Sequence, residues 1–179
     1  MDTNCTHYST SAKVAQDLPS AWADWLRKFE PFGWFVTPTF KVDVSQDFAD
    51  RQYRGWVRSI NEALYGRRYR QRGLGITHIR ATERQKRGVI HFHCLLDVEC
   101  LKLHRKTFEH VWELQSLGTN GFMRIYPYDA SLGAVHYLGK YVSKNGNMDL
   151  WLRPSLYKDI VSPLPSLFQG LPPTLDSTT

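Results

Sequence analysis

The sequence predicts an α+β fold, an antiparallel β-sheet flanked by helices, and two observations lead to this class. Segments rich in β-branched and aromatic residues alternate with segments of helical periodicity in the order β, α, β, β, α, β, α, with no internal repeat. Only a short connection separates the second strand from the third, which indicates an antiparallel hairpin. The chain has 179 residues, 42% of them hydrophobic, which is enough for one sizeable core.

The N-terminal part of the chain predicts an arm, a short helix and a strand. Residues 1–20 are rich in Ser and Thr and predict a flexible arm, with Ser20 as the N-cap of the aromatic helix AWADWLRKF. The segment GWFVTPTFKV (33–42) has the composition of a strand. Pro38 cannot donate a hydrogen bond within a sheet, so it indicates an edge position or a bulge.

A long helix and the hairpin follow. Residues 45–65 predict a helix that Gly66 can end, because the apolar positions fall on one helical face. These positions are Tyr53, Trp56, Val57, Ile60 and Leu64. The strand LGITHIRATE (74–83), the tight connection RQKRG and the strand GVIHFHCLLD (88–97) then form the hairpin.

The C-terminal part predicts two more helices with a strand between them. A helix is expected from about residue 103 to 117, then the strand GFMRIYPYD (121–129). The segment SLGAVHYLGKYVSK (131–144) predicts a helix with Ser131 at its cap. Residues 154–179 are dense in Pro and predict an extended tail. The whole order is related to the ferredoxin-like arrangement.

Composition narrows the class of partner and the compartment. Lys and Arg outnumber Asp and Glu by 23 to 17, and this surplus favours a polyanionic partner such as nucleic acid. The three cysteines form no CxxC pair, so neither a disulfide framework nor a zinc ribbon is indicated, and a reducing compartment fits best. With neither a signal peptide nor an apolar stretch of about 20 residues, we expect a cytoplasmic protein with no membrane contact.

Two histidines in the predicted hairpin are the first candidate site. Residues two apart on a strand point to the same side, so His91 and His93 can share one cation. A divalent ion needs further ligands, and Glu83 lies across from His91 if the hairpin turns around residues 86–88. A structural role for the pair remains the alternative, and His78 is either a substitute ligand or an ordinary core or surface histidine.

The predicted helix of residues 131–144 contains a second candidate group. Tyr137 and Tyr141 are four residues apart and share one face, and Lys140 and Lys144 each follow a tyrosine by three residues. A neighbouring ammonium group would help a phenol with an ordinary pKa near 10 to attack a phosphate. The other interpretation is an amphipathic helix with two packing tyrosines and two solvated lysines.

Residues that contact DNA are expected in two further places. The run RRYRQRG combines cations with an aromatic ring that could stack on an exposed base, or it is a solvated basic loop. Two threonines of the first strand share a face and either support the sheet under the site or touch DNA. These candidates are Arg67, Arg68, Tyr69, Arg70, Arg72, Thr37 and Thr39.

These motifs together resemble the HUH endonucleases, in particular the rolling-circle replication initiators (Rep proteins) of small plasmids and single-stranded DNA phages. The strand FVTPTF, the His-hydrophobic-His strand and the Tyr-x-x-Lys helix occur in the family's order between Trp34 and Lys144. The stretch ERQKRGVIHFH looks like the family's Glu-containing approach to its metal strand. The resemblance implies an HUH nuclease domain over residues 21–153.

The resemblance also implies roles for the candidate residues. His91, His93 and Glu83 would hold Mg²⁺ or Mn²⁺, and Tyr141 would attack the scissile phosphate to give a 5′-phosphotyrosyl link and a free 3′-hydroxyl. Lys144 would lie near the nucleophile. Tyr137 completes a two-tyrosine pattern, which implies alternating nucleophiles unless it merely packs or contacts DNA.

The implied function is sequence-specific nicking and joining of single-stranded DNA at a replication origin, which is expected to include a hairpin. A host helicase and a host polymerase would then be partners. Two alternatives stay open: a single-strand DNA transposase of the same superfamily, and a non-catalytic, basic nucleic-acid-binding module whose histidines bind nothing or hold a structural zinc.

Overall fold

The computed structural model describes residues 20–133, 138–139, 141, 147–153 and 156, without the side chains of 116 and 117. It contains one five-stranded antiparallel sheet in the order β4-β1-β3-β2-β5. The strands are β1 (Phe32–Phe40), β2 (His78–Arg84), β3 (Ile90–Asp97), β4 (Asn120–Pro127) and β5 (Met148–Trp151). The helices are α2 (Gln46–Tyr65) and α3 (Arg105–Leu114), together with a helix over residues 20–27.

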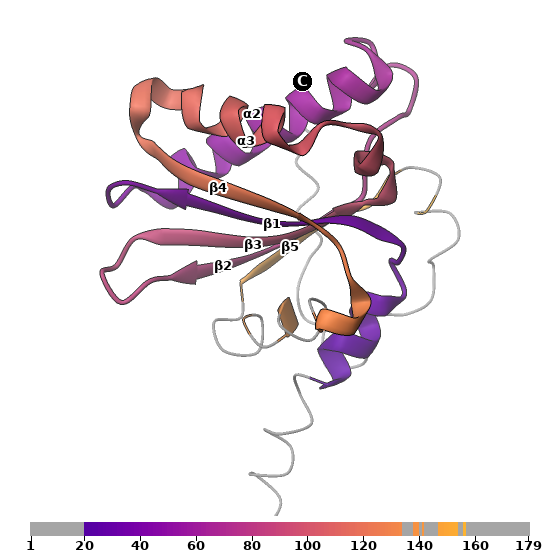
Figure 1. The fold of residues 1–179 in the computed structure, drawn as a ribbon, viewed down its shortest axis with the longest axis horizontal. Coiled ribbons are helices and arrows are strands. Elements are labelled where there is room, and N and C mark those ends of the chain that lie inside the picture. The colour runs from indigo at the N-terminus through magenta and orange to yellow at the C-terminus, as the bar shows by residue number, and fades with distance from the viewer. Residues whose placement is uncertain (1–19, 134–137, 140, 142–146, 154–155, 157–179) are drawn as a thin grey trace, which may run out of the picture.

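The predicted α+β class is confirmed, and helices flank both faces of the sheet (Figure 1). Helices α2 and α3 cover one face, and the helix of residues 20–27 lies against the other. Three short 3₁₀ helices complete the connections: η1 (Val98–Lys102), η2 (Gln115–Gly118) and η3 (Ala130–Leu132). Among the described residues, no helix has the length and apolar character needed to cross a membrane.

Helix α2 begins and ends where the sequence predicts. The Ser45 hydroxyl accepts a hydrogen bond from the backbone N–H of Phe48 at 3.2 Å, which satisfies one free donor of the first turn. Gly66 ends the helix with a φ of 78°, a conformation that glycine adopts without steric cost. The face with Tyr53, Trp56 and Ile60 is buried, as its spacing predicts.

Strand β1 lies inside the sheet, so an edge position for Pro38 is wrong. The strand pairs with β3 on one side and with β4 on the other. The alternative expectation of a bulge is confirmed, because the register with β4 shifts between Pro38 and Phe40. This irregularity accommodates a residue without an N–H within a paired strand.

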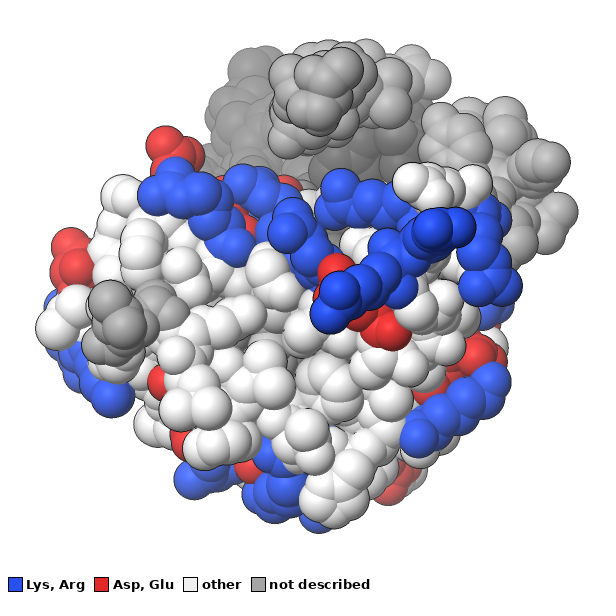
Figure 2. Space-filling model, turned by 90° about the horizontal axis from the view of Figure 1, so that it is seen from above, with Lys and Arg blue, Asp and Glu red and all other residues white. Residues whose placement is uncertain are grey.

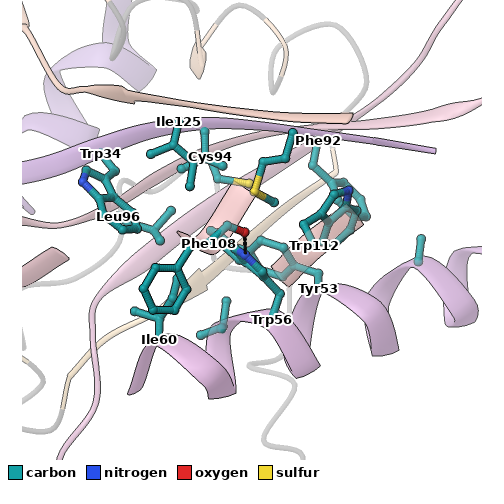
Figure 3. Packing of buried hydrophobic residues seen from close by; sticks show 14 of the residues in the cluster. Trp34, Tyr53, Trp56, Ile60, Phe92, Cys94, Leu96, Phe108, Trp112 and Ile125 are labelled. Atoms are coloured by element: carbon teal, nitrogen blue, oxygen red, sulfur yellow. Dashed lines mark hydrogen bonds between the residues drawn. The ribbon is translucent and has the colours of Figure 1, made fainter. Parts of the chain in front are cut away.

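The larger core lies between the sheet and the two helices α2 and α3 (Figure 3). Trp34, Trp56 and Trp112 are almost completely buried in it. The Trp56 indole donates a hydrogen bond to the backbone carbonyl of Phe108 at 2.9 Å, which ties α2 to α3. Cys94 is fully buried in the same cluster, which confirms its interpretation as a small core residue.

A smaller core covers the opposite face of the sheet. Leu26 and Phe29, from the N-terminal helix and the turn after it, pack there with Ile79 and Leu95 of β2 and β3. Leu138 is completely buried in this cluster, and Tyr141 packs at its margin. This face therefore holds the chain segment that contains the candidate nucleophile.

Several expectations for the C-terminal part need correction. Ser131 is no helix cap, because it lies within η3; Asp129 accepts from its backbone N–H at 2.8 Å. Gly133 ends this short helix in the left-handed conformation, and residues 138–139 and 141 are helical. Strand β5 was not predicted. Residues 1–19 and 157–179 lie outside the described residues, so the expected arm and tail are not tested.

Gly33 is predicted to tolerate no side chain. A Cβ atom there would lie 2.8 Å from the carbonyl oxygen of Asp97 and 2.9 Å from the Cα of Val98, both backbone atoms that cannot move aside easily. Gly33→Ala should therefore lower the free energy of unfolding by about 1–3 kcal/mol in urea denaturation. Gly75→Ala is the control, because its nearest contact would be 3.8 Å. Equal stabilities of the two variants would contradict this prediction.

Candidate active site

The hairpin brings the two histidines and Glu83 together. In the register of β2 and β3, Glu83 lies directly opposite His91, and Ala81 lies opposite His93. Directly opposed residues project from the same face of a sheet, so the carboxylate and both imidazoles share one side. The expected placement of Glu83 across from His91 is confirmed. Gly88 has a φ of 84° in the tight connection, which fixes this register.

Direct contacts link these side chains. Glu83 Oε2 lies 3.1 Å from His93 Nε2, and the ring centroids of His91 and His93 are 4.6 Å apart. His91 Nδ1 lies 3.1 Å from the side-chain nitrogen of Gln85. Sequence reasoning missed Gln85, although its position two residues after Glu83 on a strand-like stretch could have indicated it.

Burial keeps both imidazoles neutral at physiological pH. It lowers the pKa of His93 to about 4, and burial together with the neighbouring His93 lowers the pKa of His91 to about 4. The contact between Glu83 and His93 is therefore a hydrogen bond to a neutral ring at pH 7. A neutral imidazole is also the form that coordinates metal ions.

Tyr141 packs flat against this histidine pair. Its ring centroid lies 4.0 Å from that of His93, and the planes are inclined by only 10°. The two residues come from segments far apart in sequence, and Tyr141 is partly buried. The other predicted residues of this segment, Tyr137, Lys140 and Lys144, lie outside the described residues.

Strand β1 contributes the next side chains beside the histidines. The Phe35 ring lies nearly parallel to His93, with centroids 6.4 Å apart. Phe35 and Thr37 line an open cleft of about 910 Å³ together with Tyr126 and Tyr128. Thr39 lies opposite His91 and is buried, and its hydroxyl donates to the backbone carbonyl of Phe122 at 2.6 Å. Thr39 thus supports the sheet, whereas Thr37 lines the cleft.

The basic loop after α2 differs from expectation at its aromatic residue. Tyr69 is buried, with 6% of its surface exposed, so its ring is not available for stacking on a base. Its hydroxyl accepts a hydrogen bond from Arg70 Nε at 3.1 Å, and the ring fills the space under the loop. The arginines around it remain exposed. They are Arg67, Arg68, Arg70 and Arg72.

His78 is a core histidine and no substitute ligand. It points to the face covered by α2, where its Nδ1 lies 3.3 Å from the Tyr53 hydroxyl and its ring stacks on Trp151 at 4.3 Å. Burial, and next the charge of Arg80, lower its pKa to about 3. The core interpretation is therefore confirmed.

We expect acidification to destabilise the fold through His78. Its folded pKa of about 3 lies below the unfolded value of 6.5, so its contribution is complete above pH 6.5 and is lost as the pH falls towards 3. Between pH 7 and pH 5 this loss is about 2 kcal/mol. Urea denaturation at both pH values should show a smaller difference for His78→Asn than for the exposed-site control His104→Asn. An unchanged difference in His78→Asn would contradict the assignment.

The donor chemistry of the site suits a divalent cation, although the side chains do not converge fully. Within the described part of the chain, no group of three His, Cys, Asp or Glu side chains has the arrangement of a metal site. Two neutral imidazoles and a carboxylate are nevertheless ligands that Mn²⁺ accepts. The 3.1 Å between Glu83 Oε2 and His93 Nε2 is close to the spacing of adjacent donors around an octahedral ion with bonds of ~2.1 Å.

Comparison with known proteins adds one match to this geometry. A family model described as a replication-associated protein of the ORF2 type matches residues 33–146, which is more than half of the chain and includes β1, the hairpin and Tyr141. No curated protein and no solved structure gives a significant match. The matched region contains every part of the site described above. The chain therefore belongs to this family of replication-associated proteins.

Proposed function

We propose that the protein starts replication by nicking single-stranded DNA at an origin, as an HUH-type endonuclease with a tyrosine nucleophile. Its membership of a replication-associated family supports the process. One observation supports the chemistry: the Tyr141 ring lies flat on His93, which in turn contacts Glu83. A phenol, two neutral imidazoles and a carboxylate thus meet at one place on the sheet.

The proposed reaction is a transesterification. A bond forms between the Tyr141 oxygen and phosphorus while the bond from phosphorus to the 3′ oxygen breaks. The phenolic proton leaves Tyr141, and the departing 3′ oxygen ends as a free hydroxyl that can prime synthesis. Since one phosphodiester replaces another, the reverse reaction can rejoin the strand, which accounts for termination without an energy source.

His91, His93 and Glu83 are the residues proposed to hold Mg²⁺ or Mn²⁺. Such an ion, when bound, stabilises the negative charge that develops on the scissile phosphate. The chain itself supplies the neutral state of both imidazoles, through their burial. Gln85 holds the His91 ring by its contact at Nδ1, and Phe35 flanks His93. Lys140 and Lys144 are proposed to balance charge near the nucleophile, and Tyr137 to be a second nucleophile.

The test is covalent adduct formation with DNA. The protein is incubated with single-stranded DNA of its own replicon and Mn²⁺, and the products are separated on a denaturing gel and analysed by mass spectrometry. We expect an adduct that resists SDS, disappears with EDTA and maps to the peptide containing Tyr141. A thermal shift with Mn²⁺ alone, which His93→Ala should abolish, reports the metal site independently of activity.

The outcomes separate the proposal from its alternatives. An adduct on a tyrosine outside residues 131–144 would refute the assigned nucleophile. Binding of DNA that persists in EDTA without any adduct would favour the non-catalytic binding module. A metal that cannot be removed without unfolding the protein would indicate a closed structural site instead of an open catalytic one.

A further inference from the structure

A small pocket surrounded by arginines lies on the sheet face opposite the candidate active site. It has a volume of about 230 Å³ and is formed by the C-terminal half of α2, the loop after it, the start of β2 and the end of β5. We call it the arginine pocket, after Arg54, Arg58, Arg70 and Arg153 in its wall. No acidic residue is among those that line it.

Helix α2 supplies two of these arginines without charge compensation. Arg54 and Arg58 are exposed and four residues apart, so their guanidinium groups lie on the same helical face and repel each other. Neither forms an ion pair with any described acidic residue. The view from above shows Lys and Arg side chains gathered in a band along one side of the helix-covered face (Figure 2). A bound anion would relieve this repulsion.

Packing restrains the other two arginines before any ligand binds. The Arg70 guanidinium lies 5.7 Å from the centre of the Tyr69 ring, and its Nε donates to the Tyr69 hydroxyl. Arg153 Nη1 lies 3.3 Å from the buried carboxylate of Asp97. The Arg153 Nε is buried and has no hydrogen-bond partner among the described residues. The burial of Tyr69 thus gives the loop an ordered cation instead of an exposed aromatic ring.

The arginine pocket cannot contact the phosphate that reacts. His78, which lines the pocket, points to the α2 face, whereas Glu83 points to the histidine face. The two residues are five apart on β2, which corresponds to about 17 Å along the strand. DNA in the pocket is therefore a different part of the molecule from the strand at Tyr141.

We propose that the arginine pocket binds backbone phosphates of DNA that extends beyond the reacting strand. This inference rests on the proposed function for the presence of DNA. The contacts are guanidinium groups on phosphodiesters, so they should be independent of base sequence and strongly dependent on salt. The pocket would strengthen attachment to the origin region without selecting the nick position.

The experiment compares two triple variants of equal charge change. Arg54→Gln, Arg58→Gln and Arg70→Gln together remove three charges at the pocket, and Arg27→Gln, Lys28→Gln and Lys102→Gln remove three exposed charges elsewhere. Fluorescence anisotropy gives the affinity of the whole chain for random-sequence single-stranded DNA of about 40 nucleotides over a range of salt concentrations, long enough to leave the candidate site. We expect the pocket variant to bind about 10- to 100-fold more weakly, with a salt slope smaller by about 2.

The control variant should lose less than about threefold in affinity, since diffuse charge contributes little to specific phosphate contacts. Equal losses in both variants would refute the pocket and leave only general electrostatic attraction. No loss in either would refute it as well. The adduct assay at saturating replicon DNA keeps the two proposals apart: the pocket variant should still form the adduct, whereas failure of the wild-type protein to form one would refute the nuclease and leave the binding result intact.

Discussion

Tyr141→Phe should abolish the covalent DNA adduct, lowering its rate of formation by at least about 1000-fold, because only the attacking oxygen is removed. The phenyl ring can still lie against His93, as the tyrosine ring does at 4.0 Å, so stability and DNA affinity should stay close to those of the wild type. Adduct yield over time, circular dichroism and anisotropy measure these three properties.

Tyr126→Phe is the matched control for this variant. Tyr126 is half exposed and lines the neighbouring cleft, so its hydroxyl is near the site without touching the histidines. We expect its adduct rate to remain within about threefold of the wild type, as for a contact that only helps to bind DNA. Tyr137→Phe completes the set: if it eliminates the adduct while Tyr141→Phe does not, the principal nucleophile is Tyr137.

Arg80→Met should cause the largest loss of stability, about 3–4 kcal/mol in urea denaturation. Arg80 is a charged residue in the middle of β2 with only 3% of its side chain exposed. It pairs with Asp50 of α2 at 2.7 Å and with Asp149 of β5, and its guanidinium lies 4.4 Å from the centre of the Phe92 ring. Its removal leaves two partly buried carboxylates without their cation.

Arg84→Met provides the control, because Arg84 is on the same strand and pairs with Asp43 where both side chains are more than half exposed. An exposed pair contributes about 0–1 kcal/mol, so this variant should be close to the wild type. Asp149→Asn combined with Arg80→Met should cost less than the sum of the single changes, since the two residues act as a pair. Equal stabilities of Arg80→Met and Arg84→Met would show that the buried pairs contribute nothing net.

Local signals explain why the sequence predicted the centre of the site. The alternation of a strand puts His91 and His93 on one side, and the tight connection at Gly88 fixes the register that brings Glu83 opposite His91. Helix α2 likewise has a cap, a periodic face and a terminating glycine in its own sequence. In each case the information lies within about 20 residues of chain, the scale of a hairpin or a helix.

The features that escaped prediction depend on distant contacts. Strand β5 has four residues and no alternation of its own, and it forms because β2 offers a free edge and Arg80 attracts Asp149. Tyr69 was expected outside because it lies among arginines, but the space between α2 and the loop takes up its ring. The stacking of Tyr141 on His93 also joins segments whose sequences say nothing about each other's position.

The strand order has a consequence for how the protein would handle the product of the proposed reaction. Strands β4 and β5 form opposite edges of the sheet, and Tyr141 lies in the chain between them, so this connection is anchored at both rims with the tyrosine above the central strand β3. A nucleophile tethered at two points stays at high effective concentration over the histidines. After attack, the captured 5′ end of the DNA would be held by the same double tether, close to where a 3′-hydroxyl must return for the strand to be sealed.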